Sequence, residues 1–128
     1  MTNLSGNVTP ETAPVSAVRR YYALVDAGDV PGLTSLFAPD TCYHRPGYQP
    51  LTGRDELQRF YREDRVIVKG AHTLTAIVAD GRDVAVQGEF SGQLRDGRET
   101  SLRFADFFSF AADGLIARRD TFFFAPLV

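Results

Sequence analysis

A single acidic residue stands among aromatic residues near the end of the chain, in the segment LRFADFFSF at 102–110. In a strand, Asp106 would share its face with the residues two and four positions away, and all four of these are apolar. Burial on such a face disfavours the ionised form, so the pKa of Asp106 is expected to be raised. Such a carboxyl group can donate a hydrogen bond or act as a general acid or base near neutral pH. The alternative is a structural ion pair of Asp106 with Arg45, Arg103 or another strand arginine.

The two histidines, His44 and His72, are the side chains whose ordinary pKa suits proton transfer at neutral pH. His72 opens an expected strand and shares a face with the apolar residues at 74, 76 and 78, which places it at the rim of a cavity as a candidate base. Strand alternation makes Tyr43 point into the cavity if Arg45 does, with His44 on the opposite face. For either histidine, a packed or surface structural role is the alternative.

Three arginines, Arg45, Arg103 and Arg119, fall in expected strands where they can project inward. An inward guanidinium could bind a carboxylate, phenolate or enolate, or hold a carboxylate base in its ionised form. The alternative for each is a surface ion pair, which contributes little stability. In the last strand a slip of one residue swaps the two faces, so that either Asp120 or Arg119 with Thr121 faces the cavity. Both registers remain open.

The composition is that of an ordinary globular domain, with 128 residues, 44% of them apolar and 23% charged. We expect one domain over residues 14–128 and a flexible polar leader over residues 1–13. The net charge of −2 argues against nucleic acid as a partner, and the single cysteine excludes an intrachain disulfide. Neither a metal nor a cofactor is expected. There is no apolar stretch of the length that a signal peptide or a membrane span needs, so we expect a cytoplasmic protein with no membrane partner.

The sequence pattern divides the chain into a helical front and a meander of strands behind it. Each meander turn is marked by an Asp-Gly pair, at residues 80–81, 96–97 and 113–114, which supplies the positive φ angles of a tight hairpin. The expected helices are 14–27, with Gly28 after its end, then 30–37 and 52–65. The expected strands are 41–45, 72–79, 83–94, 99–110 and 115–124.

This order predicts an α+β cone, in which three helices cover one face of a strongly curved sheet. The pairs Phe107-Phe108 and Phe122-Phe123 would make both faces of the last two strands apolar. One face would fill the cone, and the other would need cover. We therefore expect a homodimer that forms through the outer face of the sheet.

The order of elements over residues 15–124 is similar to that of the NTF2-like superfamily, which includes ketosteroid isomerase, scytalone dehydratase, limonene epoxide hydrolase and the SnoaL-like polyketide cyclases. The segments that carry the resemblance are Asp26–Asp29, Leu36–Asp40, Gly53-Arg54 and Asp113-Gly114. It implies the cone-shaped NTF2-like fold. It says little about chemistry, because this fold hosts enzymes, binding modules and transport adaptors.

Within the superfamily the chain resembles ketosteroid isomerase most, with Tyr21 and Asp106 at the positions of the two oxyanion-hole residues of that enzyme. Arg45, before Pro46, stands where the isomerase has its catalytic aspartate, and a guanidinium cannot abstract a proton. The resemblance therefore implies an oxyanion hole without the base, and steroid isomerisation is not expected. Tyr22 lies about 100° around the helix from Tyr21, so only one of the two is expected to reach a given ligand.

The resemblance and the residues together predict a cofactor-free enzyme that performs acid/base chemistry beside a carbonyl of a small, apolar, oxygenated substrate. The reaction would be an isomerisation, an aldol-type cyclisation or a dehydration, of the kind that these families often contribute to natural-product biosynthesis. Asp106 and Tyr21 would polarise the carbonyl or move the proton, with His72 or Asp120 as base. Asp120 resembles the strand aspartate of the epoxide hydrolase and of many cyclases. The residues expected to contact the substrate are Tyr43, Arg45, Phe60, Arg103, Phe104, Phe108 and Arg119.

Two alternatives belong to other classes. The domain could be a non-catalytic module for binding or dimerisation, which an ion-paired Asp106 and a cavity filled by phenylalanines would favour. It could also be a hydrolase that activates water in the manner of the epoxide hydrolase. That reaction needs an arginine between two carboxylates, for which Glu89, Arg119 and Asp120 are the available residues.

Overall fold

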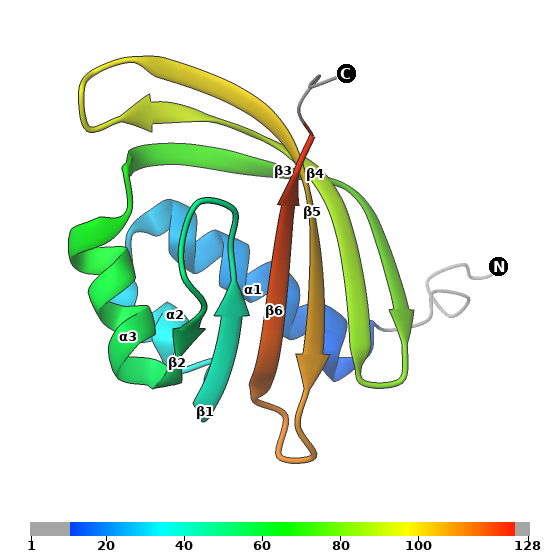
Figure 1. The fold of residues 1–128 in the computed structure, drawn as a ribbon. Helices are drawn as coiled ribbons and strands as arrows, with labels where there is room; N and C mark the ends of the chain where they lie inside the picture. The colour runs from blue at the N-terminus through cyan, green and yellow to red at the C-terminus, as the bar shows by residue number, and fades with distance from the viewer. Residues whose placement is uncertain (1–10, 125–128) are drawn as a thin grey trace, which may run out of the picture.

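The computed structural model describes residues 11–124, which form a layer of helices against one curved sheet (Figure 1). The elements are α1 Ala13–Ala27, α2 Val30–Thr34, β1 Phe37–His44, β2 Leu51–Thr52, α3 Gly53–Arg59, the π-helical turn η2 Phe60–Asp64, β3 Ile67–Asp80, β4 Asp83–Leu94, β5 Glu99–Phe110 and β6 Ile116–Phe123. The expected leader at residues 1–13 lies largely outside the described residues.

The six strands form a single sheet in the order β2-β1-β6-β5-β4-β3. β1 runs parallel to β6, and the other neighbours are antiparallel. Figure 1 shows the helices on one side of the sheet, with the long strands β3, β4 and β5 bending over them. The α+β cone that the sequence predicts is therefore confirmed.

Helix α1 has a sequence that suits both its ends and its buried face. A proline lies in its first turn, where a missing N–H costs nothing, and Gly28 ends it in the left-handed conformation with φ of 73°. The side chains that α1 buries are Val15, Val18, Tyr21, Tyr22 and Val25. Two tyrosines on this face bring hydroxyl groups into the interior, where they need hydrogen-bond partners.

The second helix ends at Thr34 rather than at residue 37, and Phe37 instead begins β1. Phe37 is fully buried and pairs with Ile116 of β6. Pairing with a strand distant in the sequence outweighs the local helical pattern, so β1 is longer than the expected strand at 41–45.

The expected helix at 52–65 is divided into α3 and the wider turn η2. At its start the backbone N–H of Thr52 donates to the Glu56 side chain at 3.0 Å, and the Thr52 side chain makes no cap bond. The η2 turn carries Phe60 and Tyr61. Such π-helical turns often occur at functional sites.

The meander agrees with the sequence at β4 and β5, whose bounds are those expected. Gly81, Gly97 and Gly114 have positive φ angles of 58°, 88° and 87°, as the Asp-Gly turns require. β3 is longer than expected because it pairs with β4 out to Leu94. His72 therefore lies inside β3, opposite Phe90, rather than at the start of the strand.

The register between β5 and β6 decides which side chains of β6 face the helices. Thr121 lies opposite Asp106 and Arg119 opposite Phe108, with an irregularity between Ser109 and Phe110. Arg119 and Thr121 are consequently buried on the inner face with Asp106. Asp120, which alternates with them, lies on the outer face.

The outer face of the sheet carries large apolar side chains. Phe107 is 51% exposed and Phe122 is 56% exposed, and their ring centroids are 5.8 Å apart. Together with residues such as Val78, Ala85 and Ala105 they line a hollow of about 490 Å³. Among residues 11–124, no helix has the length and apolar character needed to cross a membrane.

Candidate functional site

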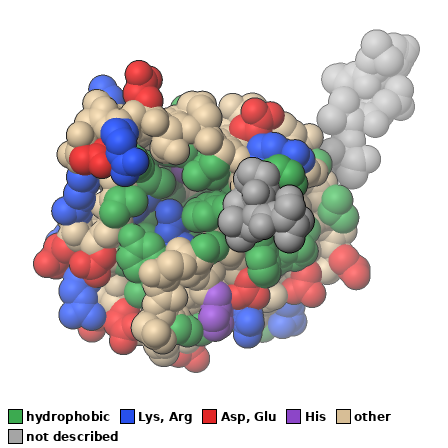
Figure 2. Space-filling view, turned by 45° about the horizontal axis from the view of Figure 1, so that its top comes forward, with side chains coloured by type: hydrophobic (Ala, Val, Ile, Leu, Met, Phe, Trp, Pro, Cys, Tyr) green, Lys and Arg blue, Asp and Glu red, His purple; other side chains and the backbone are tan. Residues whose placement is uncertain are grey.

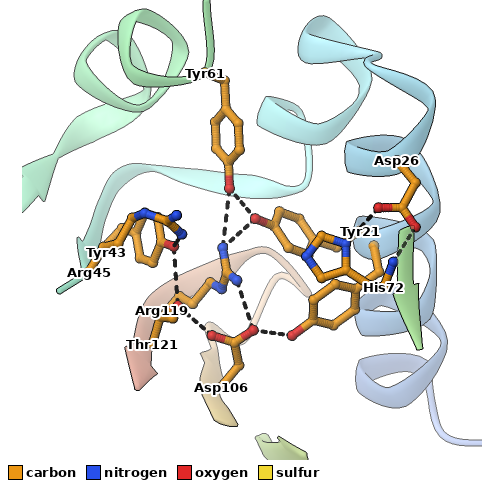
Figure 3. Close-up of polar contacts among 10 residues, drawn as sticks. Tyr21, Asp26, Tyr43, Arg45, Tyr61, His72, Asp106, Arg119 and Thr121 are labelled. Atoms are coloured by element: carbon orange, nitrogen blue, oxygen red, sulfur yellow. Dashed lines mark hydrogen bonds and ion pairs between the residues drawn. The ribbon is translucent and has the colours of Figure 1, made fainter. Parts of the chain in front are cut away.

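Asp106 lies at the centre of the interior and is fully buried. Arg119 Nη2 donates to its Oδ2 at 2.8 Å, and Tyr22 donates to the same oxygen. Thr121 donates to Oδ1. Figure 3 shows one oxygen of the Asp106 carboxylate bonded to Thr121 and the other to Arg119. The ion-pair alternative is therefore the observed arrangement, and the partner is Arg119 rather than Arg45 or Arg103.

Arg119 is enclosed by aromatic rings as well as by its carboxylate partner. Its guanidinium carbon lies 4.6 Å from the ring centroid of Tyr21 and 4.6 Å from that of Tyr43. Burial by itself lowers the pKa of Arg119, but the Asp106 carboxylate and the surrounding tyrosines raise it well above its ordinary value. Arg119 is thus a permanent cation inside the cone.

The hydroxyl groups of Tyr21 and Tyr61 meet at Nη1 of Arg119, which donates to both, with a distance of 3.2 Å to Tyr61 (Figure 3). The two hydroxyls also bond to each other. Two hydroxyls carry two protons and their mutual bond uses one, so one O–H has no acceptor among residues 11–124. Burial raises the pKa of both tyrosines, which keeps them neutral and able to donate.

A second row of hydrogen bonds reaches Asp106 from the side of β1. Arg45 Nη1 donates to the Tyr43 hydroxyl at 3.2 Å, and this hydroxyl is 3.2 Å from that of Thr121. Because the single Thr121 proton is directed to Asp106, Tyr43 supplies the proton between these two hydroxyls. The row therefore runs from Arg45 through Tyr43 and Thr121 to the carboxylate.

His72 on β3 is paired with Asp26 at the end of α1. His72 Nδ1 is 2.6 Å from Asp26 Oδ1, and the His72 backbone N–H donates to Asp26 Oδ2 at 2.9 Å (Figure 3). Since a carboxylate only accepts, Nδ1 carries the proton and Nε2 keeps its lone pair. Burial lowers the pKa of His72, the contact with Asp26 opposes this shift, and the charges of Arg119 and Arg65 add to it. His72 is therefore a neutral imidazole oriented by a carboxylate.

One small cavity lies between the Arg119 cluster and His72. It has a volume of about 20 Å³, the space of roughly one water molecule. Its lining residues are Tyr21, Val25, Arg45, Tyr61, Arg65, Ile67, His72, Phe90, Leu102, Phe104, Arg119, Thr121 and Phe123. A recess of about 310 Å³ shares several of them and opens between the end of α1 and the start of β3. In Figure 2 basic side chains are visible in a hollow framed by hydrophobic ones.

The structure brings part of the expected site together. The expected site residues that line the cavity are Tyr21, Arg45, His72, Phe104 and Arg119. Those that are buried around it without lining it are Tyr43, Phe60, Asp106 and Phe108. The expected direct role of Asp106 does not suit its placement, because its two oxygens are bound by three protein donors.

Two expected site residues lie on the opposite side of the sheet. Asp120 Oδ1 is 3.0 Å from His44 Nδ1, and its Oδ2 accepts from Arg118 Nε at 3.0 Å. The Arg103 guanidinium lies 4.9 Å from the ring centroid of Phe124 and does not reach the inner cavity. Strand alternation places both residues outside, because Asp106 on β5 and Arg119 on β6 point inward.

Tyr21 and Tyr22 both belong to the buried polar cluster, but they bind different partners in it. Both rings pack against Phe108, at centroid distances of 5.8 Å for Tyr21 and 6.1 Å for Tyr22. Tyr22 rather than Tyr21 donates to Asp106. The Tyr21 hydroxyl instead accepts a hydrogen bond from Arg119.

Sequence reasoning did not single out Asp26, Tyr61 or Arg65 as site residues. A signal for Asp26 exists, because it follows Tyr22 by four positions and so shares its helix face. The contact of Asp26 with His72 joins residues 46 positions apart and depends on how β3 crosses α1. No local pattern indicates that contact.

Comparison with known proteins places this geometry in a family. Residues 18–119 match the model of the SnoaL-like domain. The fold is similar to the crystal structure of an NTF2-like protein of unknown function from Burkholderia pseudomallei, with a TM-score of 0.81 and 21% identity over 89% of this chain and 92% of the other. That likeness is one of fold. Because the family model matches most of the chain and the cone-shaped fold is shared, the chain belongs to the SnoaL-like domain family of the NTF2-like superfamily.

Proposed function

We propose that this protein is a cofactor-free enzyme that removes a proton beside the carbonyl of a small, apolar, oxygenated molecule. One observation carries the proposal: an imidazole oriented by Asp26 and the buried cation Arg119 line the same cavity. A base and a site for developing negative charge are the two parts that such a reaction needs. The product class, whether isomer, cyclised or dehydrated molecule, depends on the substrate.

His72 is the proposed base. Its Nε2 lone pair takes a proton from the carbon next to the carbonyl, and the electron pair of that C–H bond moves onto the carbonyl oxygen to give an enolate. Asp26 accepts from Nδ1 and stabilises the imidazolium that forms. The same Nε2–H can then return the proton to another carbon or to a leaving hydroxyl group.

Arg119 and the hydroxyl pair of Tyr21 and Tyr61 are the proposed oxyanion site. Arg119 supplies a fixed positive charge, and the O–H without an acceptor can donate to the enolate oxygen. Asp106 acts here as a positioning residue, because it holds Arg119 and Tyr22 rather than the substrate. Phe104 and the other apolar lining residues exclude water.

Substrate entry requires movement of side chains, because the cavity of about 20 Å³ holds no organic molecule. Arg45 stacks between Phe60 and Phe123, at 5.4 Å and 5.1 Å from their ring centroids. We propose that this stack opens when the substrate binds.

Hydrogen–deuterium exchange at the α-carbon of 2-tetralone, followed by NMR in deuterated water, tests the proposal. The wild-type protein should accelerate the exchange, and His72→Gln should remove the acceleration. His44→Gln is the matched control, because His44 pairs with Asp120 on the outer face. If His72→Gln and the wild type exchange the ketone at the same rate, the proposed base is wrong.

The non-catalytic module is the second candidate, and the closed cavity and the fully partnered Asp106 favour it. It predicts that 2-tetralone or similar ketones bind without exchange. The hydrolase alternative is not proposed, because Asp120 pairs with His44 and Arg118 on the outer face. Glu89 lies opposite Arg103 on that face as well.

We also propose that the protein forms a homodimer through the outer face of the sheet. The supporting observation is the exposed apolar hollow around Phe107 and Phe122, which a second copy of the same face can cover.

A further inference from the structure

Three arginine Nε–H groups are buried without a hydrogen-bond partner among residues 11–124, and they belong to Arg45, Arg65 and Arg119. All three arginines line the same small cavity. A buried N–H without an acceptor is unfavourable, and proteins seldom leave one so. Three such donors at one cavity indicate that the cavity is built to receive an acceptor from outside the chain.

The charges around the cavity indicate what kind of acceptor this is. Its lining contains three guanidinium groups and no acidic side chain. Within residues 11–124, the ion pair of Asp106 with Arg119 is the only one that neutralises any of these three guanidinium groups. Among the described residues, Arg45 and Arg65 have no carboxylate within 4.0 Å and contact aromatic rings instead. The cavity thus holds an excess of positive charge that an anion would balance.

Arg65 stands where the cavity meets the outer recess and lines both. Its guanidinium carbon is 5.6 Å from the Tyr61 ring centroid, so it borders the proposed oxyanion site. A guanidinium group presents a planar fork of donors that matches the two oxygens of a carboxylate. The remaining lining at Ile67, Phe90 and Leu102 is apolar.

We propose that the substrate is an apolar carboxylic acid, bound as its carboxylate by Arg65 and Arg45 while Arg119 faces the reacting carbonyl. That this acid is a substrate, and not only a ligand, rests on the function proposed above. The anion site itself rests on the three unpartnered N–H groups and the charge of the cavity.

Binding of benzoate is compared with that of benzamide, which has nearly the same shape and no charge, by titration of the full chain. We expect benzoate to bind at least about tenfold more tightly than benzamide. Arg65→Met, which keeps the apolar stem, should reduce this preference strongly and leave benzamide binding unchanged. Arg62→Met is the matched control, because Arg62 is exposed on η2, three residues before Arg65, and does not line the cavity. It should change neither affinity.

A second readout is the pKa of His72 measured by NMR. A bound carboxylate offsets the positive field of Arg65 and Arg119, so benzoate should raise this pKa and benzamide should not. Equal binding of the two probes, binding of neither, or an equal loss in Arg62→Met and Arg65→Met would each overturn the anion site.

The proposed enzyme activity and the proposed anion site can be rejected independently of each other. A preference for benzoate that is retained in His72→Gln, with no exchange of any α-proton by the wild type, would uphold the anion site and reject the enzyme. Exchange of 2-tetralone by the wild type with no preference for benzoate would uphold the enzyme and reject the anion site.

Discussion

Arg119 lies diagonally across the β5–β6 pair from Asp106, two residues along β6 from Thr121, which is directly opposite Asp106. This offset lets Nη2 reach Oδ2 at 2.8 Å while the other side of the guanidinium faces Tyr21 and Tyr61. One side chain thereby connects the buried carboxylate to the hydroxyl groups at the cavity. The Asp106–Arg119 ion pair fixes the position of the guanidinium at the cavity. Burying its two charges costs desolvation free energy.

The Asp106–Arg119 pair should be strongly coupled in stability. Asp106→Ala leaves Arg119 as a buried charge without its counter-ion, and we expect a loss of about 3–5 kcal/mol in the free energy of unfolding. The double variant Asp106→Leu with Arg119→Met should recover part of this loss, because it removes both charges. Urea denaturation measures the free energy of unfolding of both variants. Asp96→Ala, which breaks the exposed pair with Arg98, is the control and should change stability little. A double variant that is no more stable than Asp106→Ala would contradict the coupling.

His72 should titrate below its ordinary pKa, because burial disfavours the imidazolium. Asp26→Asn should lower this pKa further, since the contact with Asp26 is the influence that raises it. NMR titration of the ring protons measures both values, and the His44 signals, from the outer face, should not respond to the substitution. A pKa of His72 that rises in Asp26→Asn would show that the pairing is misassigned.

The lowered pKa of His72 also predicts how the stability of the fold depends on pH. Above about pH 6.5 the imidazole is neutral in the folded and the unfolded chain, so its contribution does not change with pH. As the pH falls from there to the lowered pKa of the folded state, the unfolded chain binds the proton more readily and stability decreases. Urea denaturation across this window should show the decrease in the wild type and not in His72→Gln. If His72 is the base, the exchange rate should fall over the lower part of the same window.

Gly88 on β4 should not tolerate a side chain. A Cβ atom there would lie 2.6 Å from the Thr73 carbonyl oxygen and 2.7 Å from the Phe104 ring. Gly88→Ala must therefore displace backbone or the ring that lines the cavity, and we expect a loss of about 1–3 kcal/mol in unfolding free energy. Ser91→Ala, on the exposed face of the same strand, is the comparison and should have a small effect. Equal stability of Gly88→Ala and the wild type would show that the ring packs differently.

The outer face should control the oligomeric state. Phe107→Ser places a hydroxyl group in the proposed interface, and sedimentation velocity should show a shift from dimer to monomer. Val66→Ser is the control, because Val66 is 48% exposed between η2 and β3, away from the sheet face. A wild-type protein that sediments as a monomer at all concentrations would reject the proposed dimer.

Much of the fold follows from local signals in the chain. Gly28 ends α1, and the Asp-Gly turns bound β4, because both depend on backbone conformations that few residues adopt. The expected strands at β4 and β5 are correct for this reason. The start of β1 at Phe37 could not be predicted, because it depends on pairing with Ile116 far along the chain.

The residue types of the site could also be read from the sequence, since a carboxylate among phenylalanines and a histidine on an apolar strand stand out by pattern alone. Their partners were decided by tertiary structure. The pairing register of β5 and β6 turned Arg119 inward and Asp120 outward, a choice that one residue of slip would reverse. The crossing of β3 over α1 joined His72 to Asp26, and the curvature of the sheet brought Tyr21 and Tyr22 to one cluster. Local sequence sets the alternation of side chains along each strand, but only the packed sheet sets which face of each strand meets the helices.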